Sequence, residues 1–308
     1  MTKAARQQGR SISKTVPVHA GVDQGGPSVR VHRADSYREK APLSTSPAGR
    51  REGRPRFRKL GLGLRGLVGA AVLVVAFPSV AFAAPPAALP GNATAEESRW
   101  QPAMDYDGDG CYPTPAIGPD GTLNGGLKNT GALNGDCRDL SDLENTNSYV
   151  RSKCNNGWCA YLYDFYFEKD QAVPGPVDCC GHRHDWEHVV VWVSDGAARY
   201  VSTSAHGDYR TSPASEVAWE GEHAKIVYHK DGASTHAMRL ASASEAPENH
   251  KGAWQYPTLV GWDGYPAGIR DILTSADFGS ASMAIKDSSF NGNLESAKPG
   301  GIPFDPHA

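Results

Sequence analysis

Short apolar or alternating segments, separated by turn residues, recur through the second half of the chain. Gly, Asp, Ser and Pro punctuate them, as expected for β-strands joined by tight turns. We expect strands at residues 161–167, 188–193, 200–203, 216–219 and 226–229. Residues 267–274 have helical spacing, and no repeat or coiled-coil pattern occurs. The pattern predicts a mainly β fold, a single-domain β-sandwich with a few flanking helices.

The first 83 residues differ from this pattern. Residues 1–59 are polar and lack a sustained apolar period, which predicts a disordered extension; a true translation start downstream of Met1 would shorten it. Residues 60–83 follow a basic stretch and contain a short apolar run that closes on Ala81-Phe82-Ala83. This order is typical of a signal peptide, with cleavage near Ala83. The alternative is a membrane anchor, but the run is short of about 20 residues and contains Pro78.

Removal of this leader changes the charge. Residues 1–83 hold 15 of the 31 Lys and Arg but 4 of the 34 Asp and Glu, which leaves 16 basic and 30 acidic residues and a net charge of about −14. Such an acidic protein is not expected to bind nucleic acid or bare anionic lipid. A Pro/Ala-rich linker, residues 84–95, precedes one domain at 96–308, which is long enough for a full core.

All six cysteines lie in this exported part. An even number of cysteines in an exported chain predicts disulfides, and the alternative of a zinc site fits none of the common spacings. An Asn156-Gly157 turn favours a hairpin bridge between Cys154 and Cys159. The remaining candidates are Cys111, Cys137, Cys179 and Cys180.

The densest cluster of chemically active side chains is the run from Gly181 to Glu187, GHRHDWE, which leads into the apolar strand at 188–193. Alternate residues of a strand share a face, so Asp185 and Glu187 should point the same way. Gly181 permits a sharp turn that can bring His182 beside them. Two carboxylates and one imidazole suit a hard divalent cation better than zinc. The alternative is a solvated polar strand end.

This heptapeptide resembles that of the necrosis- and ethylene-inducing-peptide-like (NLP) family of secreted cytolysins. Further blocks resemble the family's in the same order, across roughly residues 97–295: GLK at 126–128, NGDCRD at 134–139, YDFYFEKD at 163–170, SAHG at 204–207, VYH at 227–229, DFG at 277–279 and IKD at 285–287. The segment at 105–110 resembles that of the subgroup with an extra disulfide and a calcium segment. The resemblance implies a central sandwich similar to actinoporins and fungal lectins.

The resemblance also implies the roles of particular residues. The metal ligands would be Asp170, His182, Asp185 and Glu187, holding Mg²⁺ or Ca²⁺. For Asp170, the alternative is a turn residue that caps the Pro-Gly-Pro loop. Other residues would support the ligands or contact a headgroup: Arg183, His184 and His206. The family's usual bridge would join Cys111 to Cys137, and Cys179 and Cys180 would remain as a vicinal pair.

A second acidic motif, Asp105-Tyr106-Asp107-Gly108-Asp109-Gly110, matches the start of an EF-hand loop. The acidic residue needed at the twelfth position is replaced by Ala116, so a complete EF-hand is excluded. An incomplete calcium loop at Asp105, Asp107 and Asp109 and a plain acidic turn are both left open.

The resemblance implies a secreted, monomeric, metal-dependent cytolysin without catalytic residues. Its partners would be plant plasma-membrane glycosphingolipid headgroups, the glycosyl inositol phosphoryl ceramides, and a plant immune receptor. A non-lytic glycan-binding or immune-eliciting protein of the same fold is the first alternative. A secreted metal-dependent hydrolase is the second, but no general base and oxyanion hole can be assigned.

Overall fold

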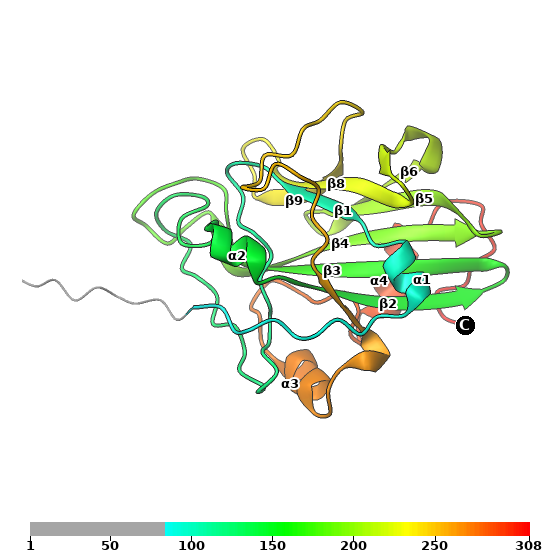
Figure 1. Ribbon diagram of the computed structural model, residues 1–308, viewed down its shortest axis with the longest axis horizontal. Coiled ribbons are helices and arrows are strands. Elements are labelled where there is room, and N and C mark those ends of the chain that lie inside the picture. The colour runs from blue at the N-terminus through cyan, green and yellow to red at the C-terminus, as the bar shows by residue number, and fades with distance from the viewer. Residues whose placement is uncertain (1–83) are drawn as a thin grey trace, which may run out of the picture. The chain divides into compact units, whose positions relative to one another are not determined.

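The structure, a computed structural model, describes residues 84–308, and two β-sheets form its frame (Figure 1). The extension at 1–59 and the signal peptide at 60–83, both predicted from the sequence, lie outside the described residues. The larger sheet has the order β10 (Thr258–Gly261), β2 (Asn147–Asn155), β3 (Trp158–Gln171), β4 (Gly181–Ser194), β5 (Ala197–Ala205), β6 (Asp208–Pro213). The smaller sheet contains β1 (Ala103–Tyr106), β8 (His223–Lys230), β7 (Trp219–Glu220) and, paired with β8, β9 (His236–Leu240). β2 to β6 are antiparallel neighbours.

The two central strands, β3 and β4, are buried on both faces. Tyr163 and Val189 lie on one face, in a core shared with Tyr228 of the smaller sheet. Leu162 and Val190 lie on the opposite face. There they share a core with residues of α3 (Ile269–Ser275) and α4 (Phe290–Ala297). The fold is therefore a β-sandwich with helices on the outer face of its larger sheet, as predicted. Burial on both faces explains why residues 158–167 of β3 form a nearly continuous apolar run, interrupted only by Asp164.

Four of the five predicted strands are confirmed, and so is the helix at 267–274, which is α3. The strand at 216–219 was wrong. The chain forms a 3₁₀ turn at Ala214–Glu216 after Pro213, and only Trp219 enters a strand. The short helices α1 (Ala95–Arg99) and α2 (Leu140–Glu144) and the 3₁₀ turn at Trp262–Gly264 complete the frame. Among residues 84–308, no helix combines the length and apolar character needed to cross a bilayer.

The segment at 84–95, predicted as a linker, is fixed to the domain. Asn147 of β2 accepts a hydrogen bond from Leu89 N at 2.8 Å and donates one to Leu89 O at 3.0 Å. Leu89 itself is buried. Thr94 caps α1 in a capping box with Glu97. The amide of Asn147 thus gives this extended segment the pairing that a neighbouring strand would otherwise provide.

Two disulfides form where the sequence and the resemblance placed them, Cys154–Cys159 and Cys111–Cys137. The first closes the β2–β3 hairpin, whose turn residues Asn156 and Gly157 both have positive φ angles, as this turn type requires. The vicinal pair left over, Cys179 and Cys180, is free and exposed in this structure. Their Sγ atoms lie 2.8 Å apart.

The start of β4 needs a glycine. A Cβ atom on Gly181 would lie 2.1 Å from the backbone oxygen of Asp170, across the β3–β4 pair. We therefore expect Gly181→Ala to lower the free energy of unfolding by about 2–4 kcal/mol, since the strand ends must separate. Gly175→Ala in the same loop is the matched control, because a Cβ there meets nothing within 4 Å. Chemical denaturation of both variants measures the difference, and equal stabilities would contradict the argument.

Candidate metal centre

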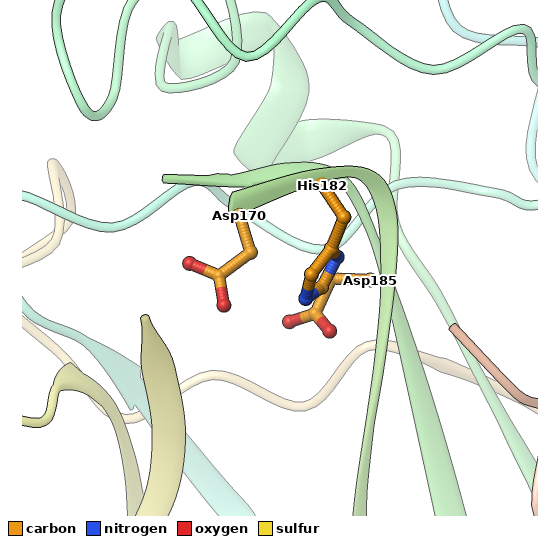
Figure 2. A group of neighbouring side chains, drawn as sticks. All are labelled: Asp170, His182 and Asp185. Carbon is orange, nitrogen blue, oxygen red and sulfur yellow. The ribbon is translucent and has the colours of Figure 1, made fainter. Parts of the chain in front are cut away.

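Asp170 and His182 are direct cross-strand partners at the ends of β3 and β4, and Asp185 follows three residues later on β4. Figure 2 shows their side chains directed toward one space. In a regular strand His182 would share a face with His184. The positive φ of His184, 62°, interrupts the alternation, and His182 lies with Asp185 instead. The sequence interpretation placed the irregularity at Gly181 alone.

The three side chains can serve as metal ligands. Their ligand atoms lie within 4.8 Å of one another, the only such group of His, Cys, Asp and Glu in the described part of the chain. His182 Nδ1 lies 2.6 Å from the backbone oxygen of His184. Because that oxygen can only accept, Nδ1 carries the proton, and Nε2 keeps its lone pair for a ligand. The donor set of carboxylate oxygens and one imidazole fits a divalent cation.

The smaller sheet holds these ligands in place. Asp170 accepts hydrogen bonds from the backbone N of His236 at 2.9 and 3.0 Å, and His236 Nδ1 lies 2.7 Å from Asp170 Oδ1. Asp185 Oδ2 accepts a hydrogen bond from Tyr228 Oη at 3.0 Å. The rings of Tyr228 and His236 stack on each other. The site is therefore assembled by both sheets, and β8 and β9 set the orientation of carboxylates that β3 and β4 carry.

Glu187, the fourth predicted ligand, lies outside the close group of three. It lines the same cavity, where it is buried and accepts a hydrogen bond from Ser204 Oγ. It faces the same side as Asp185, as strand alternation predicted. Glu187 is thus placed to complete a coordination shell, directly or through water.

The carboxylates destabilise one another when ionised. Burial, with the charge of Asp170 as the next cause, raises the pKa of Asp185 to about 6. Burial and then the charge of Asp185 raise the pKa of Glu187 well above its usual range. A cation would remove this repulsion, because it compensates charges that the buried site cannot solvate. The electrostatics and the donor geometry therefore indicate the same ligand.

A cavity of about 380 Å³ opens from this cluster to the surface. Its outer wall is polar and includes Asp208, Tyr209, Ser280, Ser282 and Asn293. This is the lower end of the volume range of small-molecule sites. Hydroxyl, amide and carboxylate groups around a cation suit a polyhydroxylated ligand better than an apolar one.

The other predicted site residues have separate positions. His184 faces away from Asp185, with Nδ1 2.6 Å from Tyr166 Oη, and its ring packs edge-on to Phe278. Burial lowers the pKa of His184 to about 4, so the ring is neutral. Arg183 is exposed and donates to Gly125 O at 3.2 Å. His206 lines the cavity and lies 3.1 Å from Asp231 Oδ2.

The candidate calcium loop does not converge. Asp105 accepts hydrogen bonds from Glu248 N and the Asn249 side chain. Asp107 pairs with Arg239 at 3.4 Å. Asp109 Oδ1 instead lies 3.7 Å from His236 Nε2. The three carboxylates therefore have different partners. Asp109 contacts His236, which itself contacts the candidate ligand Asp170.

Sequence reasoning missed His236, whose ring is almost fully buried. It is 66 residues from Asp170, in a short segment without a distinguishing pattern, and only the pairing of β9 with β8 brings it to the cluster. Tyr228 was noted only within a resembling block. The apolar run Ile226-Val227-Tyr228 in β8, all buried, was the one local signal that this segment faces inward.

Replacing His236 with Ala should weaken cation binding by about 10- to 100-fold, the usual effect of losing a residue that orients a metal ligand. Asp170 would keep the backbone N–H but lose the imidazole. Isothermal titration with Ca²⁺ and with Mg²⁺ measures the change. His307→Ala is the control, since that side chain is exposed near the C-terminus. An unchanged affinity in His236→Ala would show that this ring does not position Asp170.

The comparisons with known proteins agree with one another. Residues 94–297 match the family model described as necrosis inducing protein (NPP1). "Necrosis-inducing protein NPP1" of Phytophthora nicotianae is 34% identical over 215 residues, which cover 67% of this chain and 84% of that protein.

Solved structures of this type superpose on the domain. "NLPPya in complex with mannosamine" is 33% identical, with a TM-score of 0.58, covering 69% of this chain and 95% of that one. "Non-toxic HaNLP3 protein" is 28% identical, with a TM-score of 0.59, covering 70% and 99%. Shared sequence, shared fold and the heptapeptide at the cavity lead to one conclusion: the chain belongs to the necrosis-inducing NLP family.

Proposed function

We propose that this protein is an exported toxin that binds Mg²⁺ or Ca²⁺ and, through that cation, the sugar headgroups of plant plasma-membrane glycosphingolipids, and that it then permeabilises the membrane. The cation is held by Asp170, His182, Asp185 and Glu187. Once bound, it attracts the oxygen atoms of the sugar. No covalent step is required.

The observation that carries this proposal is the polar cavity above a cluster of mutually repelling buried carboxylates. An acidic chain is repelled by bare anionic lipid, so a cation and a sugar ligand offer the route to a membrane. The similar protein NLPPya has been solved in complex with mannosamine, which supports a sugar as the class of ligand. The two disulfides suit an exported protein.

The test is electrolyte leakage from dicot leaf discs treated with the purified protein. Leakage is expected with the native protein, and it should disappear in chelator and return when excess Ca²⁺ or Mg²⁺ is added. Sedimentation with vesicles that contain glycosyl inositol phosphoryl ceramide, compared with phosphatidylcholine vesicles, reads binding separately. Leakage that persists in chelator would exclude the cation-dependent mechanism.

A second candidate is a non-lytic binder or immune elicitor of the same fold, favoured by the similarity to the non-toxic HaNLP3 protein. The two candidates differ in one combination of results. Cation-dependent binding to headgroup vesicles without any leakage would support the second and exclude lysis.

A further inference from the structure

Two free thiols lie side by side next to the candidate metal ligands. Cys179 and Cys180 are exposed, and their Sγ atoms are 2.8 Å apart. All six cysteines of the chain lie among residues 84–308, and the other four are bridged. Neither thiol belongs to the candidate ligand group, so metal binding does not explain why the two sulfur atoms lie so close together.

Both backbone carbonyl groups of this pair are hydrogen-bonded to neighbouring segments. Asn129 Nδ2 donates to Cys179 O at 2.7 Å, and Ala172 N donates to Cys180 O at 2.7 Å. Gly181 follows immediately, packed against the backbone of Asp170, and then His182. A change of conformation at the two cysteines is therefore transmitted to a candidate ligand within two residues.

We propose that Cys179 and Cys180 form a reversible redox modification site, whose disulfide form fixes the loop leading into His182 and tightens the cation cluster. The oxidant is a small disulfide, R–S–S–R. One cysteine thiolate attacks it, forms a mixed disulfide and releases one R–S⁻; the second thiolate then displaces the other. Two electrons pass from the cysteine sulfurs to the oxidant, and the two thiol protons end on the two RSH products.

The geometry favours both closure and reopening. The sulfur atoms need to approach only from 2.8 Å to about 2.05 Å. Neighbouring Cα atoms are about 3.8 Å apart across a trans peptide, closer than in ordinary disulfides, which makes such a bridge easier to reduce. The exposed position admits the reductant, whereas the Cys111–Cys137 bridge is buried. Residues 179–180 can thus cycle while that bridge persists.

The bridge should act by limiting the conformations of the loop. Both carbonyl groups of the pair are already hydrogen-bonded in the thiol form, so closure selects the arrangement that places His182 beside Asp170. Pre-organising a ligand reduces the entropy lost on binding. The expected gain in cation affinity is about three- to tenfold; this part rests on the proposed cation function.

The experiment compares the protein equilibrated in reduced and in oxidised glutathione. Iodoacetamide labelling with peptide mass spectrometry reports the state of each cysteine, and hydrogen exchange reports protection of residues 171–183 without any cation. Calcium titration then measures affinity in both states. The Cys179→Ser/Cys180→Ser variant should lose the redox difference, and Cys154→Ser/Cys159→Ser should retain it.

Closure of the bridge in oxidised glutathione, with slower exchange at 171–183 and tighter calcium binding, is the expected result. Thiols that remain labelled, or a bridge that leaves exchange at 171–183 unchanged, would overturn the modification site. Equal or weaker calcium binding in the bridged form would overturn its effect on the cluster. Absence of calcium and magnesium binding in both states would instead contradict the proposed function. Hydrogen exchange at residues 171–183 would still show whether the disulfide between Cys179 and Cys180 fixes the loop.

Discussion

Replacing Asp185 with Asn is expected to abolish cation binding and leaf-disc leakage, and at the same time to make the cation-free protein more stable. The two effects have opposite signs because one carboxylate causes both. Ligand charge sets cation affinity in oxygen-rich sites, so removing one charge should cost about 100-fold or more. In the cation-free protein the same charge is buried beside Asp170, which raises the pKa of Asp185 to about 6.

The stabilisation follows from that pKa. Two pKa units above the ordinary value correspond to about 2–3 kcal/mol of unfavourable ionisation at neutral pH. Asn removes the charge and can still accept the hydrogen bond from Tyr228 Oη. Thermal unfolding in chelator should therefore show a midpoint a few degrees above that of the native protein. An inert substitution or a merely damaging one would not give lost binding together with raised stability.

Asp195→Asn provides the matched control. The substitution is chemically the same, the side chain is exposed in the turn between β4 and β5, and its positive φ, 53°, is one that Asn tolerates. Native affinity, leakage and stability are expected. If Asp185→Asn bound calcium as tightly as this control, the cation would have to bind elsewhere.

The sequence predicted those parts of the site that depend on local order. Asp185 and Glu187 share a face because strands alternate, and the apolar run after them indicated that β4 is a core strand. The Asn156-Gly157 turn likewise predicted the Cys154–Cys159 disulfide that closes its hairpin. Each inference needs only a few consecutive residues and a backbone geometry that most strands share.

The parts that could not be predicted depend on distant pairing. His236 reaches Asp170 because β9 pairs with β8 and the two sheets face each other, which no local pattern records. The positive φ of His184 was also hidden, because only a few per cent of residues other than Gly adopt one, yet it turns His182 into the cluster. The separate partners of the carboxylates at Asp105, Asp107 and Asp109 were hidden for the same reason, because those partners lie far along the chain, at residues 236–249.

The effect of pH on stability should reverse when the cation is added. In the cation-free protein, the folded state gives Asp185 a pKa of about 6, above its usual value of 3.8, and Glu187 is also raised. Between those two values the folded protein holds a proton that the unfolded chain does not, so the free energy of unfolding rises as the pH falls. As the pH falls from about 6 to about 4, protonation of Asp185 removes the cost of its buried charge and stabilises the cation-free protein.

With saturating Ca²⁺ the sign changes, because the cation binds the ionised carboxylates and protons compete with it. The increase in unfolding midpoint caused by Ca²⁺ should be largest near pH 7.5 and nearly absent near pH 5. Differential scanning calorimetry across this range, in chelator and in Ca²⁺, measures both trends. Titrating groups outside the cluster cancel in the difference between native protein and Asp185→Asn. A calcium effect independent of pH would contradict a site made of these buried carboxylates.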